Sequence, residues 1–157
     1  MKFTTLTLAA LVAAGAAMAE PVAPVDVVFT EDGAVEASLS GMAGDAANGA
    51  KVVGSKKLGN CVACHEISAL ADIPFQGEVG PALDGAGDRW EAAQLRGILS
   101  NSKLTFEGTV MPAYYKVDGF NRPSNAYTGK AAEGPLDPLL SAQDIEDVIA
   151  FLSTLKE

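Results

Sequence analysis

Histidine, cysteine and basic residues are scarce in this chain of 157 residues. Its one histidine and two cysteines leave a zinc site short of the roughly four ligands that it needs. Lysine and arginine number 11 against 20 aspartate and glutamate residues, and the formal net charge is −9. Nucleic acids and anionic lipid surfaces both require clustered cations on their protein partners. The composition therefore argues against either of them as a partner.

The sequence also lacks the run of roughly 20 apolar residues that a membrane-spanning helix requires. Its apolar stretch near the start, residues 6–17, is short and Ala-rich, follows Lys2 and ends at an A-x-A cleavage pattern. We expect residues 1–19 to be a signal peptide that is cleaved after Ala19, with a retained N-terminal anchor as the alternative. Loss of Lys2 and of no acidic residue would change the net charge from −9 to −10. Export, the low pI and the Ala-, Gly- and Val-rich composition together favour a bacterial periplasm.

The exported part is long enough for one compact domain, expected over residues 45–157. Residues 20–44 are interpreted as an N-terminal extension rather than as core. In this extension, residues 25–29 could form a short strand, and residues 40–44 are typical of a flexible joint.

Two helices are expected in the first part of the domain. One runs from Asp45, a good N-cap, to about Lys57. It contains Gly49, which disfavours a helix and is best explained by another helix that crosses closely there. The next helix is expected over residues 89–99, with Asp88 as its cap.

The last helix has the clearest pattern. Ser141 and Asp144 form an S-x-x-D capping pattern. Apolar residues then recur at three- and four-residue spacing, at Ile145, Val148, Ile149, Leu152 and Leu155. Residues 100–140 are expected to be mostly irregular, and an irregular stretch of this length usually has a function or wraps a ligand or partner.

Both cysteines and the histidine lie in one motif. Residues 61–65 read C-V-A-C-H, which is the C-x-x-C-H attachment signature of c-type haem. Two thiols on one helical turn, Cys61 and Cys64, can each add to a vinyl group of the porphyrin, and His65 can then ligate the iron. A thioredoxin-like dithiol needs a βαβ pattern that is not visible here. A disulfide is the usual fate of a cysteine pair in an exported protein, but the three-residue spacing and the adjacent His65 change that interpretation. A chance match remains as an alternative.

Two methionines remain after removal of the signal peptide, and either could supply a second axial ligand. Met111 is followed by Pro112 on a loop beyond the second expected helix, which suits haem ligation. Met42 precedes the first expected helix, which would place it on the order of 20 Å from the cysteines. We therefore favour Met111, with ordinary packing in the core as the alternative. Without this ligand the iron would have an open or water-occupied site.

Residues 80–83 read G-P-A-L and follow His65 by 15 to 18 positions. A backbone carbonyl in this stretch could accept the outer ring N–H of His65, which would orient the imidazole and make it a better donor to iron. A plain proline-directed turn is the alternative.

These motifs resemble those of class I cytochromes c over roughly residues 45–155. The resemblance depends on Gly49, on C-V-A-C-H at 61–65, on G-P-A-L at 80–83, on V-M-P at 110–112 and on Phe151. It implies an all-α fold whose helices wrap around one covalently attached haem c, with a long loop after the distal methionine. It also implies that Pro81 offers its carbonyl to His65 and that Met111 is the distal ligand.

A narrower resemblance is to the SoxX family, the mono-haem subunits of SoxAX cytochromes in bacterial sulfur oxidation. It depends on residues 56–65, 110–123 and 141–156. The resemblance implies a SoxA-like partner subunit and a complex that acts as an L-cysteine S-thiosulfotransferase, coupling thiosulfate oxidatively to a cysteine of the SoxYZ carrier. This chain would transfer electrons to a soluble cytochrome c and would have no catalytic residue, since haem occupies both its cysteines. Residues 134–139 lengthen the loop before the last helix and depart from the family pattern.

Two other functions stay open at this point. The chain could be a free, diffusing electron carrier, although such a carrier needs neither residues 20–44 nor the long segment 112–140. It could also be a haem enzyme that acts alone, such as a peroxidase, if Met111 does not bind the iron. Aromatic and arginine residues after Met111 could form a partner interface or cover the haem edge: Tyr114, Tyr115, Phe120, Arg122 and Tyr127.

Overall fold

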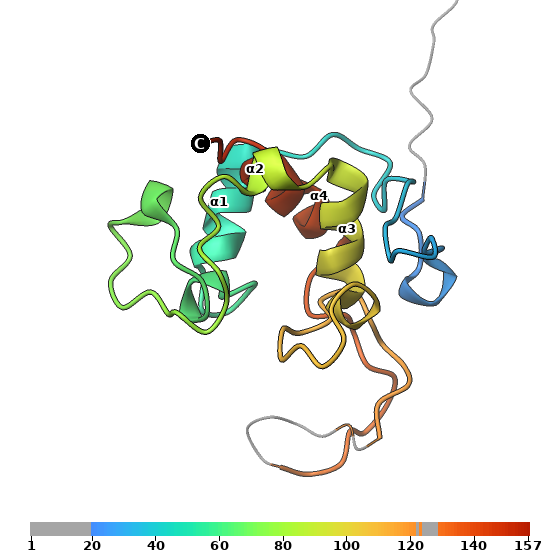
Figure 1. Cartoon of the computed structure of the whole chain (residues 1–157). Coiled ribbons are helices and arrows are strands. Elements are labelled where there is room, and N and C mark those ends of the chain that lie inside the picture. The colour runs from blue at the N-terminus through green and yellow to red at the C-terminus, as the bar shows by residue number, and fades with distance from the viewer. Residues whose placement is uncertain (1–19, 122, 124–128) are drawn as a thin grey trace, which may run out of the picture.

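The computed structural model describes residues 20–121, 123 and 129–157. The expected signal peptide, and Arg122 and Tyr127 of the expected interface, lie outside these residues. Within the described ranges the secondary structure is helical, as the predicted all-α fold requires. No strand occurs there, so the short strand suggested for residues 25–29 is wrong: Pro24–Asp26 is a 3-10 helix, and the chain after it is irregular. The elements shown in Figure 1 are η1 (Pro24–Asp26), α1 (Ala46–Gly54), η2 (Cys61–Ala63), η3 (Ser68–Leu70), α2 (Ala86–Arg89), α3 (Ala92–Asn101), η4 (Ser102–Leu104) and α4 (Ala142–Leu152). None of the helices in this part of the chain is long and apolar enough to cross a membrane.

Helices α1 and α4 cross at Gly49. Asp45 caps α1 as predicted, because its carboxylate accepts hydrogen bonds from the free amides of the first turn. A Cβ atom added at Gly49 would lie 2.0 Å from the backbone oxygen of Asp147 and 2.9 Å from the Cβ of Phe151. The backbones therefore approach too closely for any side chain at this position. The prediction that Gly49 marks a close helix crossing is confirmed.

Helix α1 ends at Gly54 rather than near Lys57, because the chain turns at Ser55. Ser55 is extended, with φ −81° and ψ 121°, and its carbonyl accepts hydrogen bonds from the amides of Leu58 and Asn60. The chain reverses in these few residues and enters the C-x-x-C-H motif directly.

The helix expected over residues 89–99 is confirmed from Ala92 onward, but its start and its cap are wrong, because two helices occupy this region. Trp90 is extended, with φ −133° and ψ 134°, and separates α2 from α3. Glu91, not Asp88, caps α3 in a reciprocal capping box with Gln94. The Trp90 ring packs edge-on against Phe106, with 5.9 Å between the ring centroids. The capping box and this aromatic contact together favour a break at Trp90 over one continuous helix.

Helix α4 begins as predicted. Ser141 caps it, and its hydroxyl and the Asp144 carboxylate each accept from the other residue's amide. The apolar residues at three- and four-residue spacing are buried in the core against α1 and α3, and so is Leu155, three residues past the end of the helix.

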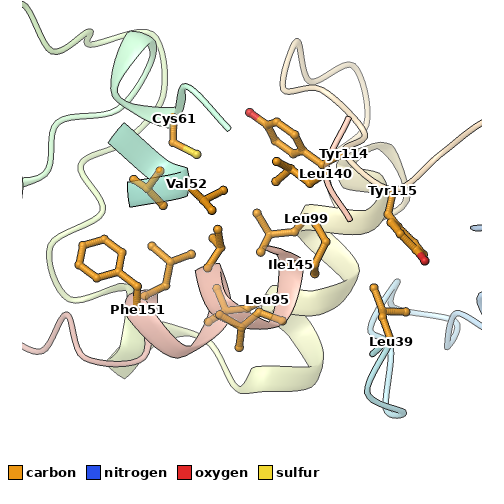
Figure 2. Close-up of a cluster of buried hydrophobic side chains, with 14 of the residues drawn as sticks. Leu39, Val52, Cys61, Leu95, Leu99, Tyr114, Tyr115, Leu140, Ile145 and Phe151 are labelled. Carbon is orange, nitrogen blue, oxygen red and sulfur yellow. The ribbon is translucent and has the colours of Figure 1, made fainter. Parts of the chain in front are cut away.

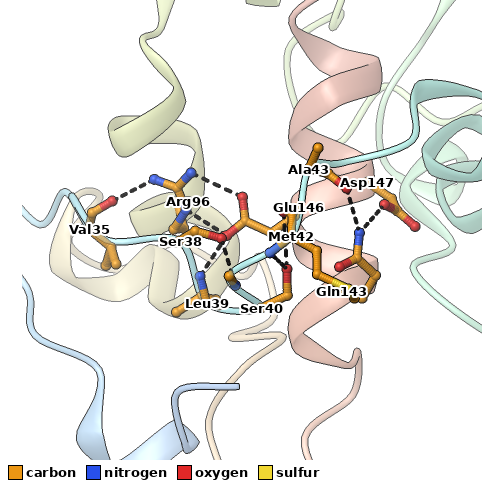
Figure 3. Close-up of polar contacts among 11 residues, drawn as sticks. Val35, Ser38, Leu39, Ser40, Met42, Ala43, Arg96, Gln143, Glu146 and Asp147 are labelled. Carbon is orange, nitrogen blue, oxygen red and sulfur yellow. Dashed lines mark hydrogen bonds and ion pairs between the residues drawn. The ribbon is translucent and has the colours of Figure 1, made fainter. Parts of the chain in front are cut away.

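The N-terminal segment, residues 20–44, contributes to this core. Val35 and Leu39 are 2% and 1% exposed and belong to the same apolar cluster as α3 and α4. The interpretation of the segment as lying outside the core is wrong for these residues. Polar contacts hold them there, since Arg96 donates to the Val35 carbonyl (2.8 Å) and Glu146 accepts from the Leu39 amide (2.7 Å) (Figure 3). Residues 40–44 also meet α4, where Gln143 donates to the Ala43 carbonyl.

Candidate haem site

The cysteines of the C-x-x-C-H motif lie on one tight turn. The amides of Cys64 and His65 both donate to the carbonyl of Cys61, at 3.0 and 2.9 Å, so η2 brings the two thiols and the imidazole onto one short stretch. Asn60 precedes this turn in the left-handed conformation, with φ 49°. Both cysteines are free thiols rather than a disulfide. Burial raises the pKa of the Cys61 thiol to about 11, which would make it a poor nucleophile at neutral pH.

The His65 ring is oriented by the backbone of residues 80–81. Its Nδ1 lies 2.7 Å from the carbonyl oxygen of Pro81. A carbonyl can only accept a hydrogen bond, so Nδ1 must carry the proton, which leaves the lone pair of Nε2 free for a metal. A Cβ atom at Gly80 would lie 2.2 Å from the ring carbon Cε1, so only glycine lets the backbone come this close.

This arrangement fits a c-type haem. Two thiols on one turn, a histidine with a free Nε2 and a glycine that makes room for its ring are the groups that covalent attachment and proximal ligation require. In the described ranges no three His, Cys, Asp or Glu side chains converge in the way that a metal held by the protein alone would need. The two thiols and one imidazole of the motif also fall short of the roughly four ligands of a zinc site, whereas a c-type haem needs only these three groups.

Met111 lies on a different segment from His65. Its carbonyl accepts from the buried Ser102 hydroxyl (2.9 Å) and from the Lys103 ammonium, and its amide donates to Thr109 (3.2 Å). Its side chain packs at the edge of the apolar core. The structure thus brings Cys61, Cys64, His65 and Pro81 together, while Met111 is fixed separately, and its role as distal ligand stays a prediction.

Met42, the alternative ligand, is 44% exposed and belongs to the N-terminal segment. Its backbone is hydrogen-bonded to the Ser40 side chain, close to α4 (Figure 3). Its side chain contributes nothing to the apolar core in which Met111 takes part.

Sequence reasoning placed Tyr114 and Tyr115 at a partner interface or over the haem edge and missed their burial. Both are 6% exposed, and each hydroxyl donates to a backbone carbonyl: Tyr114 to Gly59 (2.9 Å) and Tyr115 to Val22 (2.7 Å). Burial, together with the nearby sulfur of Cys61, raises the pKa of Tyr114 well above its usual value.

Comparison with known proteins identifies the family of this chain. The family model for cytochrome c matches residues 46–156. A solved structure, described as SoxXA from P. pantotrophus, contains a chain with 59% sequence identity and a TM-score of 0.84. The match covers 87% of this chain and 99% of that one. The search of curated proteins gave no match. With its C-x-x-C motif at Cys61 and Cys64, the chain therefore belongs to the cytochrome c family, as a haem c protein related to the SoxXA cytochrome.

Proposed function

We propose that this chain is the SoxX-like electron-transfer subunit of a periplasmic, heterodimeric cytochrome that oxidises thiosulfate. The observation that carries the proposal is the 59% identity to a chain of SoxXA across 99% of that chain's length. The match covers 87% of this chain, which is far more than the five-residue haem motif alone.

The residues of this chain would hold and tune the haem. Cys61 and Cys64 would attach it, and His65, oriented through the Pro81 carbonyl, would ligate the iron together with Met111. When bound, the haem supplies a one-electron redox centre. A hydrogen bond from Nδ1 to a carbonyl makes Nε2 a stronger donor, and a thioether ligand raises the reduction potential, so the ligand set suits an electron acceptor.

The chemistry on sulfur would take place outside this chain. The only two thiols are used for haem attachment, so none remains to accept a sulfur group. We assign the L-cysteine S-thiosulfotransferase activity to the complex with a SoxA-like subunit and a SoxYZ-like carrier. This chain would take the electrons that are released and pass them to a soluble cytochrome c. Its acidic composition and its expected signal peptide are in keeping with an exported protein.

The test is purification of the chain from its native periplasm, followed by addition of thiosulfate. We expect copurification with a second haem polypeptide and reduction of the haem by thiosulfate only when a SoxYZ-like carrier is present. The Cys61→Ala, Cys64→Ala variant is the control, because it should lack covalent haem. A monodisperse monomer that thiosulfate does not reduce under any of these conditions would instead identify a free electron carrier.

A further inference from the structure

Two adjacent buried tyrosines follow Met111 by three and four residues, and their hydroxyls point in different directions. In Figure 2 the Tyr114 hydroxyl is directed toward Cys61, whereas the Tyr115 hydroxyl is directed away from it. Tyr114 donates to the carbonyl of Gly59, two residues before Cys61. Tyr115 donates to Val22 in the N-terminal segment. Two tyrosine hydroxyls therefore connect the segment that follows Met111 to two different parts of the fold.

Tyr114 is bonded to three parts of the fold. Its amide donates to the Leu99 carbonyl of α3 (3.0 Å), and its carbonyl accepts from the Leu140 amide just before α4 (3.1 Å). Its hydroxyl reaches Gly59 across 55 positions of sequence. Gly59 is itself held by α1, since its amide donates to the Val52 carbonyl (3.1 Å). This chain of contacts connects the loop of Met111 to the turn that carries the haem motif.

The outer side of the Met111 loop is exposed, whereas the Met111 side chain packs against the apolar core. Val110 is 79% exposed, and the Met111 backbone is bonded only to residues of its own neighbourhood, from 102 to 109, in the described part of the chain. Two of these bonds hold the Met111 carbonyl to Ser102 and Lys103 of η4. The Tyr114 hydroxyl, by contrast, is bonded to Gly59, two residues before the haem motif.

We propose that Tyr114 is a positioning residue that keeps Met111 on the haem iron by bracing its loop against the haem-attachment turn at Gly59. The inference rests on the proposed role of Met111 as distal ligand. Displacement of Met111 by another ligand would require its loop to move outward, and this movement would break the bond to Gly59. Without the hydroxyl, the state with Met111 bound lacks that hydrogen bond, whereas the displaced state had already lost it. The free-energy cost of displacing Met111 is therefore lower.

The experiment compares Tyr114→Phe with Tyr115→Phe in the full-length holoprotein, with imidazole as the competing ligand. Each variant removes one buried hydroxyl that donates to a backbone carbonyl. We expect Tyr114→Phe to bind imidazole about tenfold more tightly than wild type, equivalent to about 1.4 kcal/mol. Tyr115→Phe should bind it within about twofold of wild type. Optical titration of the ferric protein gives both affinities, and the far-red sulfur-to-iron absorption band reports directly on Met111.

The outcomes distinguish the proposed positioning role of Tyr114, called the brace, from the assignment of Met111 as a ligand. If wild type and Met111→Ala bind imidazole equally well, Met111 is not a ligand and the proposed ligand set fails. If wild type resists imidazole but the two tyrosine variants behave alike, the ligand assignment stands and the brace is refuted. Native-state hydrogen exchange on wild type is an independent measurement. Saturating imidazole should speed exchange of the Tyr114 and Leu140 amides, and unchanged protection there would also overturn the brace.

Discussion

Replacement of Glu146 by alanine tests the buried ion pair that joins α3, α4 and the N-terminal segment. The carboxylate of Glu146 accepts from the guanidinium of Arg96 at 2.8 and 3.0 Å, in a two-point contact, and from the amide of Leu39 at 2.7 Å (Figure 3). The two charged side chains are only 9% and 6% exposed. Removal of the carboxylate would leave a buried guanidinium without its counter-charge.

Such a stranded charge typically lowers the free energy of unfolding by about 3–5 kcal/mol, and the unpaired Leu39 amide adds to the loss. This is a large part of the roughly 5–15 kcal/mol that stabilises a typical domain. The double variant Arg96→Met, Glu146→Leu should lose less unfolding free energy than Glu146→Ala, because it leaves no unpaired charge buried. It still loses the bonds to the Val35 carbonyl and the Leu39 amide.

Urea unfolding of the holoprotein, followed by far-ultraviolet circular dichroism, gives the change in unfolding free energy. The matched control is Lys156→Met, which breaks an ion pair with Asp88 of 3.0 Å whose side chains are 54% and 48% exposed. This control should lose less than about 1 kcal/mol, as exposed pairs do. A Glu146→Ala variant as stable as the control would refute the argument that the pair is buried and integral to the fold.

Three further predictions concern the helix crossing and the site. Burial alone would raise the pKa of Asp147, but hydrogen bonds from Asp45 and Asn48 outweigh it and lower that pKa. The charged carboxylate therefore stabilises the fold above the ordinary carboxyl pKa of about 3.9, and this stabilisation is lost as the pH falls through the lower pKa of the folded state. Urea titrations at about pH 6 and about pH 3 should show a smaller drop in unfolding free energy for Asp147→Asn than for wild type. Gly49→Ala should lower the melting temperature and cost at least about 1–3 kcal/mol, because its Cβ would lie 2.0 Å from a backbone oxygen; unchanged thermal unfolding would contradict the close crossing. Met111→Ala should let the reduced protein bind carbon monoxide, seen as a shifted Soret band, whereas wild type should resist it, and equal binding by both would exclude Met111 as a ligand.

The parts of this fold that the sequence predicted depend on short-range contacts. The caps at Asp45 and Ser141 act on amides two or three residues away, so their patterns are visible in a short window of sequence. The C-x-x-C-H motif places its groups on one turn for the same reason. Gly49 was the exception, because its unfavourable helix propensity indicated a distant partner without identifying it.

The parts that were missed depend on contacts between residues far apart in sequence. The bond from the Leu39 amide to Glu146 spans 107 positions, and the bond between Arg96 and Glu146 spans 50. Charged residues on helices are usually exposed, so neither the burial of this pair nor the inclusion of the N-terminal segment in the core could be inferred from pattern. The split between α2 and α3 was missed because the extended Trp90 depends on its contact with Phe106.

The two long-range contacts support different properties of the protein. The pair of Arg96 and Glu146 connects α3 to α4 and to the N-terminal segment, and none of its partners belongs to the segments of His65 or Met111. Loss of this pair therefore affects the whole folded state. Tyr114 connects the loop of Met111 to the turn before Cys61, so its hydroxyl acts on one local movement. On the proposed ligand assignment, global stability and retention of Met111 should therefore be separable, because different buried polar contacts would support them.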